Sequence, residues 1–344
     1  GRYSALTAFG LVPAGLAGAD IARLLDQAAV VRDELAADNQ ENPAIRLAAA
    51  LAAAHEGGAE KLVIADHDSA TPGIGDWIEQ LIAESTGKDG IGLLPVIVET
   101  VESAGFGGEF AAGPDATTVA LGEGVRGSAV TVNLPLGEQF LFWEYVTALA
   151  GKLLGINPFD QPDVEAAKKA ARGLLDSPGA EQPKPAFTDG AVQVHPGPGV
   201  ASDGTLADVL RGFVGQVPER GYLAVQAYLN RLDDASAALL RPELAKRAGH
   251  QVTFGWGPRF LHSTGQYHKG GHPNGVFLQV TGALESAAAD IEVPDRPYTL
   301  GELQLAQALG DGQVLAEHDR PVLRLHLTDR AAGLADLVRA IQEL

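Results

Sequence analysis

The sequence contains neither cysteine nor methionine among its 344 residues. Without cysteine the chain forms no disulfide and offers no thiolate for catalysis, which is typical of a protein in a reducing cytoplasm. Without methionine it cannot start at its own initiator, so we expect a processed, trimmed or excised piece of a longer protein. No apolar run approaches the roughly 20 residues that a membrane helix needs, and no secretory signal opens the chain. We therefore expect a cytoplasmic protein with no membrane partner.

Basic residues are also scarce. The chain has 25 Lys and Arg against 44 Asp and Glu, which gives a formal net charge of −19. Nucleic acids and anionic membrane surfaces bind clustered Lys and Arg, so this balance argues against both as partners. It is compatible with a small phosphate ester, which needs only a local basic pocket or one lined by N–H groups.

Helix and strand patterns alternate through the first half of the chain. Apolar residues from Leu11 to Leu35 have helical spacing. Further helices are expected at 43–55, 74–84 and 136–154, and strands at 61–65, 93–98, 118–121 and 129–132. The strands are almost continuously apolar, as in a parallel sheet with helices on both faces, and such sheets bind ligands beyond the carboxyl ends of their strands. The predicted fold class is therefore α/β.

A stretch rich in proline and glycine, 177–203, is the best candidate for a linker. After it, helices are expected at 206–214, 235–247, 300–309 and 331–344, and strands at 222–228, 251–255, 276–280 and 322–327. This second α/β unit is more irregular, because a stretch rich in Gly and His interrupts it. The expected organisation is a helical segment, an α/β domain, the linker and a C-terminal α/β domain, at residues 1–40, 41–176, 177–203 and 204–344.

The most distinctive stretch is Ile156 to Lys168, which reads INPFDQPDVEAAK. Pro162 suits the first turn of a helix, Asp160 suits a cap near its start, and Glu165 falls in the first turn. By itself this pattern is typical of a helix–loop–helix connection that carries a solvated lysine.

The same stretch closely resembles the C-terminal signature of phosphoglucose isomerases, aromatic-Asp-Gln-x-x-Val-Glu-x-x-Lys. Its fixed positions are occupied by Phe159, Asp160, Gln161, Val164, Glu165 and Lys168. Asp163 stands where the family usually has glycine. The resemblance implies a sugar-isomerase (SIS, flavodoxin-like) domain, a three-layer structure with a parallel sheet. It also implies that Lys168 lies at the sugar ring oxygen, where a cation stabilises developing negative charge, and that Gln161 contacts the substrate.

A second match is Glu84-Ser85-Thr86-Gly87-Lys88, which fits the family segment Glu-Ser-x-Gly-Lys. Alone, it is typical of a surface helix end with Gly87 as the stop. Aldose–ketose conversion removes a proton from one carbon and returns it to the next, and a single carboxylate can do both. The resemblance implies that Glu84 is this base and that Lys88 contacts the substrate.

A third match is Gly1-Arg2-Tyr3-Ser4, which fits the family loop that closes the first sugar-isomerase domain. The resemblance implies that Arg2 stabilises the enediolate, a role suited to a permanently charged, planar group, and that Ser4 contacts the substrate. It also implies that most of the first sugar-isomerase domain, which holds the substrate phosphate in this family, precedes Gly1.

The family's ring-opening histidine is expected soon after the base, but residues 93–115 contain no histidine. The nearest match is His262-Ser263-x-Gly265-Gln266, which resembles a segment of shorter bacterial isomerases. The surrounding run, 257–272, resembles the C-terminal region of fused transaldolase/phosphoglucose isomerases. This resemblance implies that His262 opens the ring together with Lys168, and that Arg259 and Lys269 contact the substrate.

Three interpretations of this run remain. His262, His268 and His272 could ligate zinc, the glycine-rich run could be an anion-facing loop, or it could be a solvated loop. No Asp or Glu lies between the histidines, and the run also contains the cations Arg259 and Lys269. We therefore favour an anion-facing loop over a metal site. Asp66-His67-Asp68, which follows a predicted strand, is interpreted as loop polarity because no nucleophile accompanies it.

The motifs together predict an aldose–ketose isomerase that interconverts glucose 6-phosphate and fructose 6-phosphate through an enediolate, without a cofactor. The resemblance implies the isomerase part of a bifunctional transaldolase/isomerase, without its transaldolase and first sugar-isomerase segments. Little activity is then expected of this piece alone. Two alternatives stay open: a non-catalytic phosphosugar-binding sensor, and an isomerase of another phosphosugar. The sequence does not indicate the oligomeric state.

Overall fold

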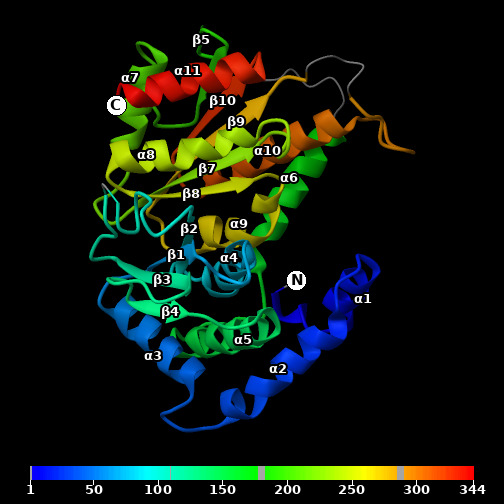
Figure 1. Ribbon diagram of the computed structural model, residues 1–344. Coiled ribbons are helices and arrows are strands. Elements are labelled where there is room, and N and C mark those ends of the chain that lie inside the picture. Colours follow the sequence, from blue (N-terminus) through cyan, green and yellow to red (C-terminus); the bar gives the residue numbers. More distant parts are fainter. Residues whose placement is uncertain (1, 109, 177–182, 285–289) are drawn as a thin grey trace. The chain divides into compact units, whose positions relative to one another are not determined.

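The computed structural model describes four stretches of the chain, residues 2–108, 110–176, 183–284 and 290–344. Contacts within them define two compact units. Unit 1 consists of Gly1–Gln161 and Gly270–His272, and unit 2 of Pro162–Lys269 and Pro273–Leu344. Each unit is built of helices around one sheet (Figure 1), so the expected α/β fold class is confirmed.

Unit 1 contains a four-stranded parallel sheet with the order β2-β1-β3-β4. Its elements are η1 (Arg2–Ser4), α1 (Ala8–Leu16), α2 (Ile21–Ala36), α3 (Pro43–Glu56), β1 (Lys61–His67), α4 (Ile74–Thr86), β2 (Leu94–Val98), β3 (Ala116–Gly122), β4 (Val130–Val132) and α5 (Leu136–Leu153). Helix α5 packs beside both α2 and α3, and α4 packs on β2. One hydrophobic core joins these helices to the strands, and Trp143 of α5 is completely buried in it.

Local signals explain where two of these helices begin and end. Helix α3 starts at Pro43, and the Asn42 side chain accepts hydrogen bonds from the N–H groups of Ala44 and Ile45. Helix α4 ends directly before Gly87, so the stop predicted at that glycine is found. The end of α4 matters for function, because it carries the Glu-Ser-x-Gly-Lys match.

Unit 2 contains a six-stranded sheet with the order β5-β6-β10-β9-β7-β8. Its elements are η2 (Pro162–Val164), α6 (Glu165–Leu175), β5 (Phe187–Asp189), β6 (Val192–Pro196), α7 (Leu206–Val214), β7 (Tyr222–Tyr228), η3 (Ala235–Leu239), α8 (Leu240–Ala248), β8 (Gln251–Trp256), η4 (Arg259–Leu261), α9 (Ser263–Gly270), β9 (Gly275–Gly282), α10 (Leu300–Glu317), β10 (Val322–Leu327) and α11 (Arg330–Gln342). Strands β7 to β10 are parallel, whereas β6 runs antiparallel to both β10 and β5.

The parallel strands of the two sheets follow the same order. In unit 1 the order is β2-β1-β3-β4, and in unit 2 it is β8-β7-β9-β10, so each sheet reads second, first, third, fourth along the chain. The strand order therefore reverses between β1 and β3 and again between β7 and β9, which are the positions where such sheets place ligands. The sequence contains no short-period repeat that predicts this shared topology.

Three stretches differ from the sequence-based expectations. The boundary between the units lies after Gln161, well before residue 176. Within the expected linker, 177–182 lies outside the described residues, while β5 and β6 form the antiparallel edge of the second sheet. The Gly- and His-rich stretch is not a solvated loop, because most of it forms η4 and the buried helix α9.

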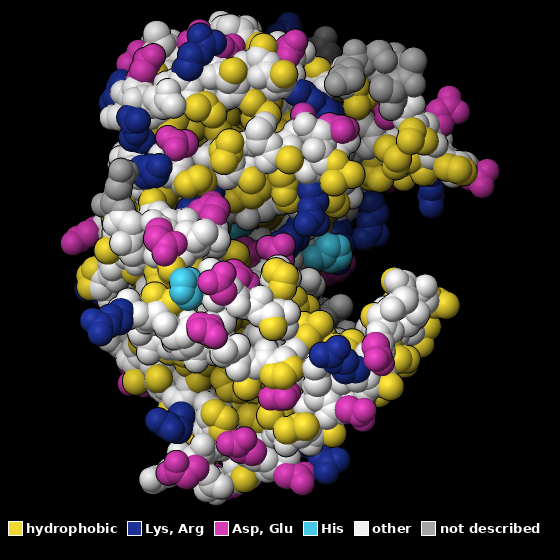
Figure 2. Space-filling model, viewed as in Figure 1, with side chains coloured by type: hydrophobic (Ala, Val, Ile, Leu, Met, Phe, Trp, Pro, Cys, Tyr) yellow, Lys and Arg dark blue, Asp and Glu magenta, His cyan; other side chains and the backbone are white. Residues whose placement is uncertain are grey.

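Apolar side chains are exposed along α1 and α2. Phe9 and Leu16 are 86% and 87% exposed, and Val12, Leu25 and Val30 are also exposed. Figure 2 shows hydrophobic side chains along this part of unit 1. Each of the helices described in the structure falls short of the length and apolar character that a bilayer-spanning helix needs.

Candidate active site

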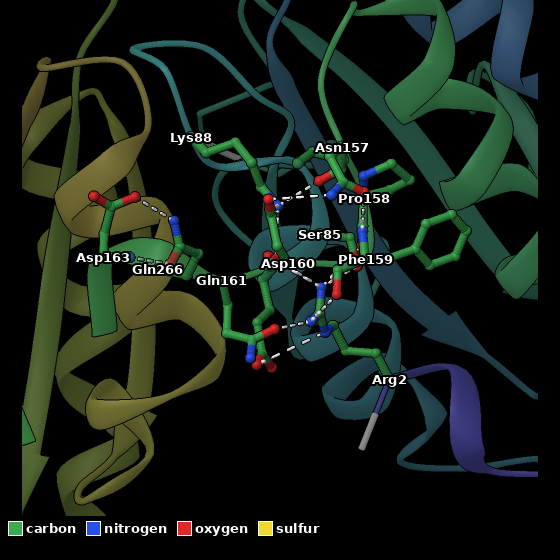
Figure 3. A network of polar contacts seen from close by, with 12 residues as sticks. Arg2, Ser85, Lys88, Asn157, Pro158, Phe159, Asp160, Gln161, Asp163 and Gln266 are labelled. Carbon is green, nitrogen blue, oxygen red and sulfur yellow. Dashed lines mark hydrogen bonds and ion pairs between the residues drawn. The ribbon is translucent and has the colours of Figure 1, made fainter. Parts of the chain in front are cut away.

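Three segments of unit 1 that are far apart in the sequence meet at Arg2. The side chain of Arg2 extends from η1 towards the end of α4 and towards the loop 156–161 that follows α5 (Figure 3). Its Nη1 atom donates to the carbonyl of Pro158 at 2.9 Å and to Oγ of Ser85 at 3.2 Å. Its Nη2 atom donates to Oε1 of Gln161. The structure thus brings together the three motifs that the resemblance singled out in this unit.

Arg2 and Glu84 form the centre of this cluster. Nε of Arg2 lies 3.7 Å from Oε1 of Glu84, and the two side chains are only 10% and 12% exposed. Nε2 of Gln80, one turn earlier on α4, lies 3.4 Å from the other carboxylate oxygen. A partly buried carboxylate beside a guanidinium is an arrangement that can accept a proton while the cation stabilises an oxyanion.

Lys88 holds the loop 156–161 and is not free to bind an anion. Its ammonium donates to the carbonyl of Asn157 at 2.6 Å, and to the carbonyl and Oδ1 of Asp160 at 2.7 and 2.6 Å. The side chain is 3% exposed. The contact with Lys88 lowers the pKa of Asp160. The substrate contact expected of Lys88 is therefore corrected: the residue holds the loop whose carbonyls accept from Arg2, and it shares the Asp160 carbonyl with Arg2.

The expected helix-capping role of Asp160 also differs from the structure. Helix α6 begins at Glu165 after the short η2 turn, and no side chain caps it. Asp160 instead binds Lys88 and accepts a hydrogen bond from Nδ2 of Asn157 at 3.1 Å. Phe159 lies beside the ring of Tyr3, with the ring centroids 4.9 Å apart. The loop is thus tied both to α4 and to η1.

The predicted ring-opening residues, Lys168 and His262, lie on two adjoining elements of unit 2. Nζ of Lys168 lies 2.7 Å from Oε1 of Glu165, one turn earlier on α6. The pKa of Glu165 is lowered, first by the hydrogen bond from Lys168 and, among smaller effects, by the charge of His262. His262 is exposed at the end of η4, which packs against α6. Lys168 is thus paired with Glu165 on its own helix, while His262 lies on the neighbouring η4 turn.

Lys269 does not face a ligand. Its Nζ atom is 2.5 Å from Oδ1 of Asp311, and both side chains are 0% exposed. The same ammonium donates to the carbonyl of Phe260 at 3.1 Å. Burial raises the pKa of Asp311, although the ammonium acts in the other direction. The expectation that Lys269 contacts the substrate is wrong for this structure, because α9 turns the side chain into the core.

The remaining predicted residues are placed as follows. Arg259 is half-buried on η4, with Nε 3.4 Å from Oγ of Ser263. Ser4 ends η1, and its carbonyl accepts from the N–H and the hydroxyl of Thr7.

The histidines that were considered as metal ligands lie in different surroundings. His268 is buried against aromatic rings, whereas Nδ1 of His272 lies 2.9 Å from Oε2 of Glu60. Within the described ranges, His, Asp and Glu side chains do not gather in threes that could hold a metal ion.

Asp163, which stands where the family usually has glycine, has a structural partner. Oε1 of Gln266 accepts from the Asp163 N–H at 2.9 Å, and Nε2 of Gln266 donates to its Oδ2 at 2.6 Å (Figure 3). Gln266 is the last residue of the His-Ser-x-Gly-Gln match and is fully buried. The parts of the two matches that lie in unit 2, 162–168 and 262–266, are therefore joined by two hydrogen bonds, one of which needs the side chain that glycine lacks.

Sequence analysis missed two residues of the Arg2 cluster, Gln80 and Ser85. Gln80 precedes Glu84 by four positions on a predicted helix, so helical spacing alone could have placed it beside the carboxylate. Ser85 is completely buried in the structure. It was part of a recognised motif, but no local pattern shows that its hydroxyl accepts from an arginine at the other end of the unit.

No family model matches the sequence. Over part of its length, however, the chain is similar to curated glucose-6-phosphate isomerases. It is 33% identical over 237 residues to the enzyme of Clostridium novyi (strain NT) and 32% identical over 235 residues to that of Symbiobacterium thermophilum. These matches cover 54% and 53% of this chain and 52% of each relative. The chain spans about half the length of the curated relatives it matches, and the expected resemblance is confirmed over that half.

Two solved structures also align with the chain. A hypothetical protein from Thermus thermophilus aligns with a TM-score of 0.35 and 13% identity, over 99% of this chain and 91% of that one. The glucose-6-phosphate isomerase from Chlamydia trachomatis aligns with a TM-score of 0.33 and 12% identity, over 94% of this chain and 69% of that one.

Proposed function

We propose that this chain is the isomerase part of an enzyme that interconverts glucose 6-phosphate and fructose 6-phosphate. The observation that carries the proposal is the contact between Arg2 and Glu84 inside a ring of groups from three separate motifs. A base and a fixed cation at this distance suit a reaction in which a proton leaves a carbon beside a carbonyl and negative charge develops on oxygen. The similarity to glucose-6-phosphate isomerases over half of the chain supports the same substrate class.

In the proposed mechanism, Glu84 removes the proton from C2 of the open-chain aldose and returns it to C1. The electrons move to the C1 oxygen, which forms the enediolate, and the guanidinium of Arg2 stabilises that charge. A proton then passes from the C2 hydroxyl to the C1 oxygen, so that return of the Glu84 proton to C1 leaves the carbonyl at C2. Gln161 orients Arg2, since its amide oxygen accepts from Nη2. Lys168 and His262 are assigned to ring opening. The mechanism requires no cofactor, and we further propose that the full-length protein also carries a transaldolase.

The test is Glu84→Gln in the full-length protein, assayed by coupled turnover of both sugar phosphates. Loss of a general base lowers the rate about 10²–10⁴-fold, and a circular dichroism spectrum identical to wild type would show intact folding. Asp76→Asn, which changes an exposed acid earlier on α4, is the matched control and should keep full activity. Retained activity in Glu84→Gln would contradict the assignment of Glu84 as the catalytic base. Binding of glucose 6-phosphate without any turnover in wild type would instead favour a phosphosugar sensor.

A further inference from the structure

His262 is presented to solvent by a run of residues that is otherwise buried. Within 260–269, all of which the structure describes, His262 is exposed and the other residues are buried. Its backbone joins η4 to α9, because its N–H donates to the carbonyl of Arg259 at 3.0 Å and its carbonyl accepts from the N–H of Gln266 at 3.2 Å. Packing of the neighbouring residues can therefore fix where the imidazole stands.

The turn that contains His262 is tight and strained. A side-chain carbon at Gly265 would lie 1.6 Å from the carbonyl oxygen of Phe260, so the close approach of these two segments requires glycine. Ser263, directly after His262, has a φ of +25°, which residues other than glycine rarely adopt. A backbone of this kind persists only where the surrounding structure holds it.

The ammonium of Lys269 holds both sides of this turn. It donates to the carbonyl of Phe260 at 3.1 Å, before His262, and to the carbonyl of Gly265 at 3.3 Å, after it. Its third partner is Oδ1 of Asp311, at 2.5 Å. An ammonium group has three donors, so these three acceptors occupy it fully and fix the two carbonyls that bracket His262.

Asp311, which anchors Lys269, lies on α10 beside a close contact with α6. A side-chain carbon at the neighbouring Gly310 would lie 2.6 Å from the backbone nitrogen of Ala171. The absence of a side chain at this glycine lets the two helices approach each other closely. Because α6 carries Lys168, the helix that anchors Lys269 also supports Lys168.

A small apolar cluster joins the same helix to the turn. Val314 of α10, Ala167 of α6 and Leu261 of η4 are buried and pack together. Ala167 directly precedes Lys168, and Leu261 directly precedes His262. The two residues assigned to ring opening therefore share α10 as a common support.

We propose that Lys269, anchored by Asp311, is a positioning residue for His262. Its ammonium holds the carbonyls on both sides of the turn, so the imidazole stands in a fixed place relative to Lys168, which the same helix supports. The consequence for catalysis rests on the proposed function, whereas the hold on the turn does not. Loss of the ammonium should displace His262, and a displacement of about 1 Å costs roughly 10²-fold in rate.

The hold on the turn can be tested by hydrogen exchange in the full-length protein that carries Lys269→Met and Asp311→Leu. Removing both charges leaves neither of them buried and unpaired, so this double variant should fold. The amides of His262 and Gln266 should exchange roughly 10-fold faster, because the hydrogen bonds that fix the turn are lost. Unchanged exchange would overturn the inference whatever the activity of the enzyme.

Two further variants complete this test. Lys61→Met with Asp115→Leu removes another buried lysine paired with an aspartate, at the start of β1, and is the matched control that should leave the exchange at 262–266 unchanged. Lys269→Met with Asp311→Asn retains an acceptor for Gln226, which donates to Asp311 at 3.0 Å in the wild type. It gives the same comparison if the leucine variant does not fold.

The consequence for ring opening can be measured apart from proton transfer between carbons. In Glu84→Gln the proposed base is absent, but the proposed ring-opening residues remain, so the enzyme should still interconvert the two anomers of glucose 6-phosphate. Magnetisation exchange between the anomeric proton signals measures this rate. Adding Lys269→Met and Asp311→Leu to Glu84→Gln should lower the rate about 10²-fold, whereas adding the Lys61 and Asp115 changes should retain it.

The outcomes separate a positioning role from a purely stabilising one. Anomer exchange at the rate of the Glu84→Gln parent, in a folded variant that lacks Lys269 and Asp311, would overturn the inference. A wild-type protein that neither isomerises glucose 6-phosphate nor accelerates its anomer exchange would instead refute the proposed function. The amide exchange of His262 would then still decide whether Lys269 holds the turn.

Discussion

Nε of Arg2 lies 3.7 Å from Oε1 of Glu84, although 82 positions separate the two residues in the sequence. The two residues lie on separate elements, Arg2 on η1 and Glu84 in the last turn of α4, so local structure alone does not bring them together. The backbone carbonyls of 158–160 complete the arrangement by accepting from the same guanidinium. The contact therefore depends on the packing of three segments, and this dependence leads to the first two predictions.

Arg2→Lys should not preserve activity. A lysine offers one ammonium in place of a planar group whose nitrogens contact Ser85, Gln161 and several carbonyls at once. We expect kcat/KM to fall about 10²–10³-fold in both Arg2→Lys and Arg2→Ala, as for the loss of a group that stabilises an oxyanion. Steady-state kinetics with glucose 6-phosphate measures this loss. Arg23→Lys, at an exposed position on α2, is the control and should behave as wild type. Full activity in Arg2→Lys would mean that charge alone is required.

Lys88→Met should loosen the loop 156–161 without unfolding unit 1. The variant removes three hydrogen bonds to Asn157 and Asp160, while the aliphatic part of the side chain still fills its buried site. We expect faster hydrogen exchange at 157–161 and a free energy of unfolding lower by at least about 1.5–3 kcal/mol, the range for one hydrogen bond to a charged group. Peptide-level exchange and chemical denaturation measure the two effects. Lys152→Met, at an exposed lysine of α5, should change neither. Unaltered exchange in Lys88→Met would contradict the role of Lys88 in holding the loop 156–161.

Lys269→Met should destabilise the protein strongly, whereas the double variant with Asp311→Leu should be less affected. The single change leaves a buried carboxylate without its cation, which costs about 3–5 kcal/mol. Removing both charges avoids this cost, although Gln226 then loses its hydrogen bond to Asp311. Urea denaturation of wild type and the variants gives the comparison. If the double variant were less stable than Lys269→Met, the pair would not be the source of the loss.

His195→Gln should make stability less sensitive to acid. Burial, helped by the charge of Arg324, lowers the pKa of His195 from 6.5 to about 4. As the pH falls through this window, the unfolded state binds a proton that the folded state rejects, so stability is complete above pH 6.5 and declines towards pH 4. Denaturation at several pH values should show a flatter dependence in His195→Gln. His318→Gln, at an exposed histidine, should retain the wild-type slope.

Much of the secondary structure could be predicted because the core-forming segments are locally distinct. The helix at 206–214 and the strands at 222–228 and 322–327 have the expected bounds. These strands are short apolar runs that a covered sheet requires. Strands β5 and β6 could not be predicted in the same way, because their own sequence resembles a linker. They are stabilised by antiparallel pairing of β6 with β10 and of β5 with β6.

Sequence patterns do not distinguish a lysine that contacts a ligand from one that is buried in an ion pair. Lys88 and Lys269 were interpreted as substrate contacts, yet each is buried against an acid at a distant position. A lysine in a glycine-rich run looks the same in the sequence whether it faces solvent or a buried carboxylate. The acidic partner, Asp160 for Lys88 and Asp311 for Lys269, determines which role the lysine has, and only tertiary packing brings that partner close.

By itself, the sequence determined the α/β class, the alternation of elements and the identity of Arg2, Glu84 and Gln161 as candidate residues. Only the tertiary structure decided that these three side chains meet and that Lys88 holds a loop. The reason is physical. Hydrophobic periodicity and motif spacing are local properties of a chain, whereas hydrogen bonds and ion pairs between distant segments exist only after the core has brought those segments together.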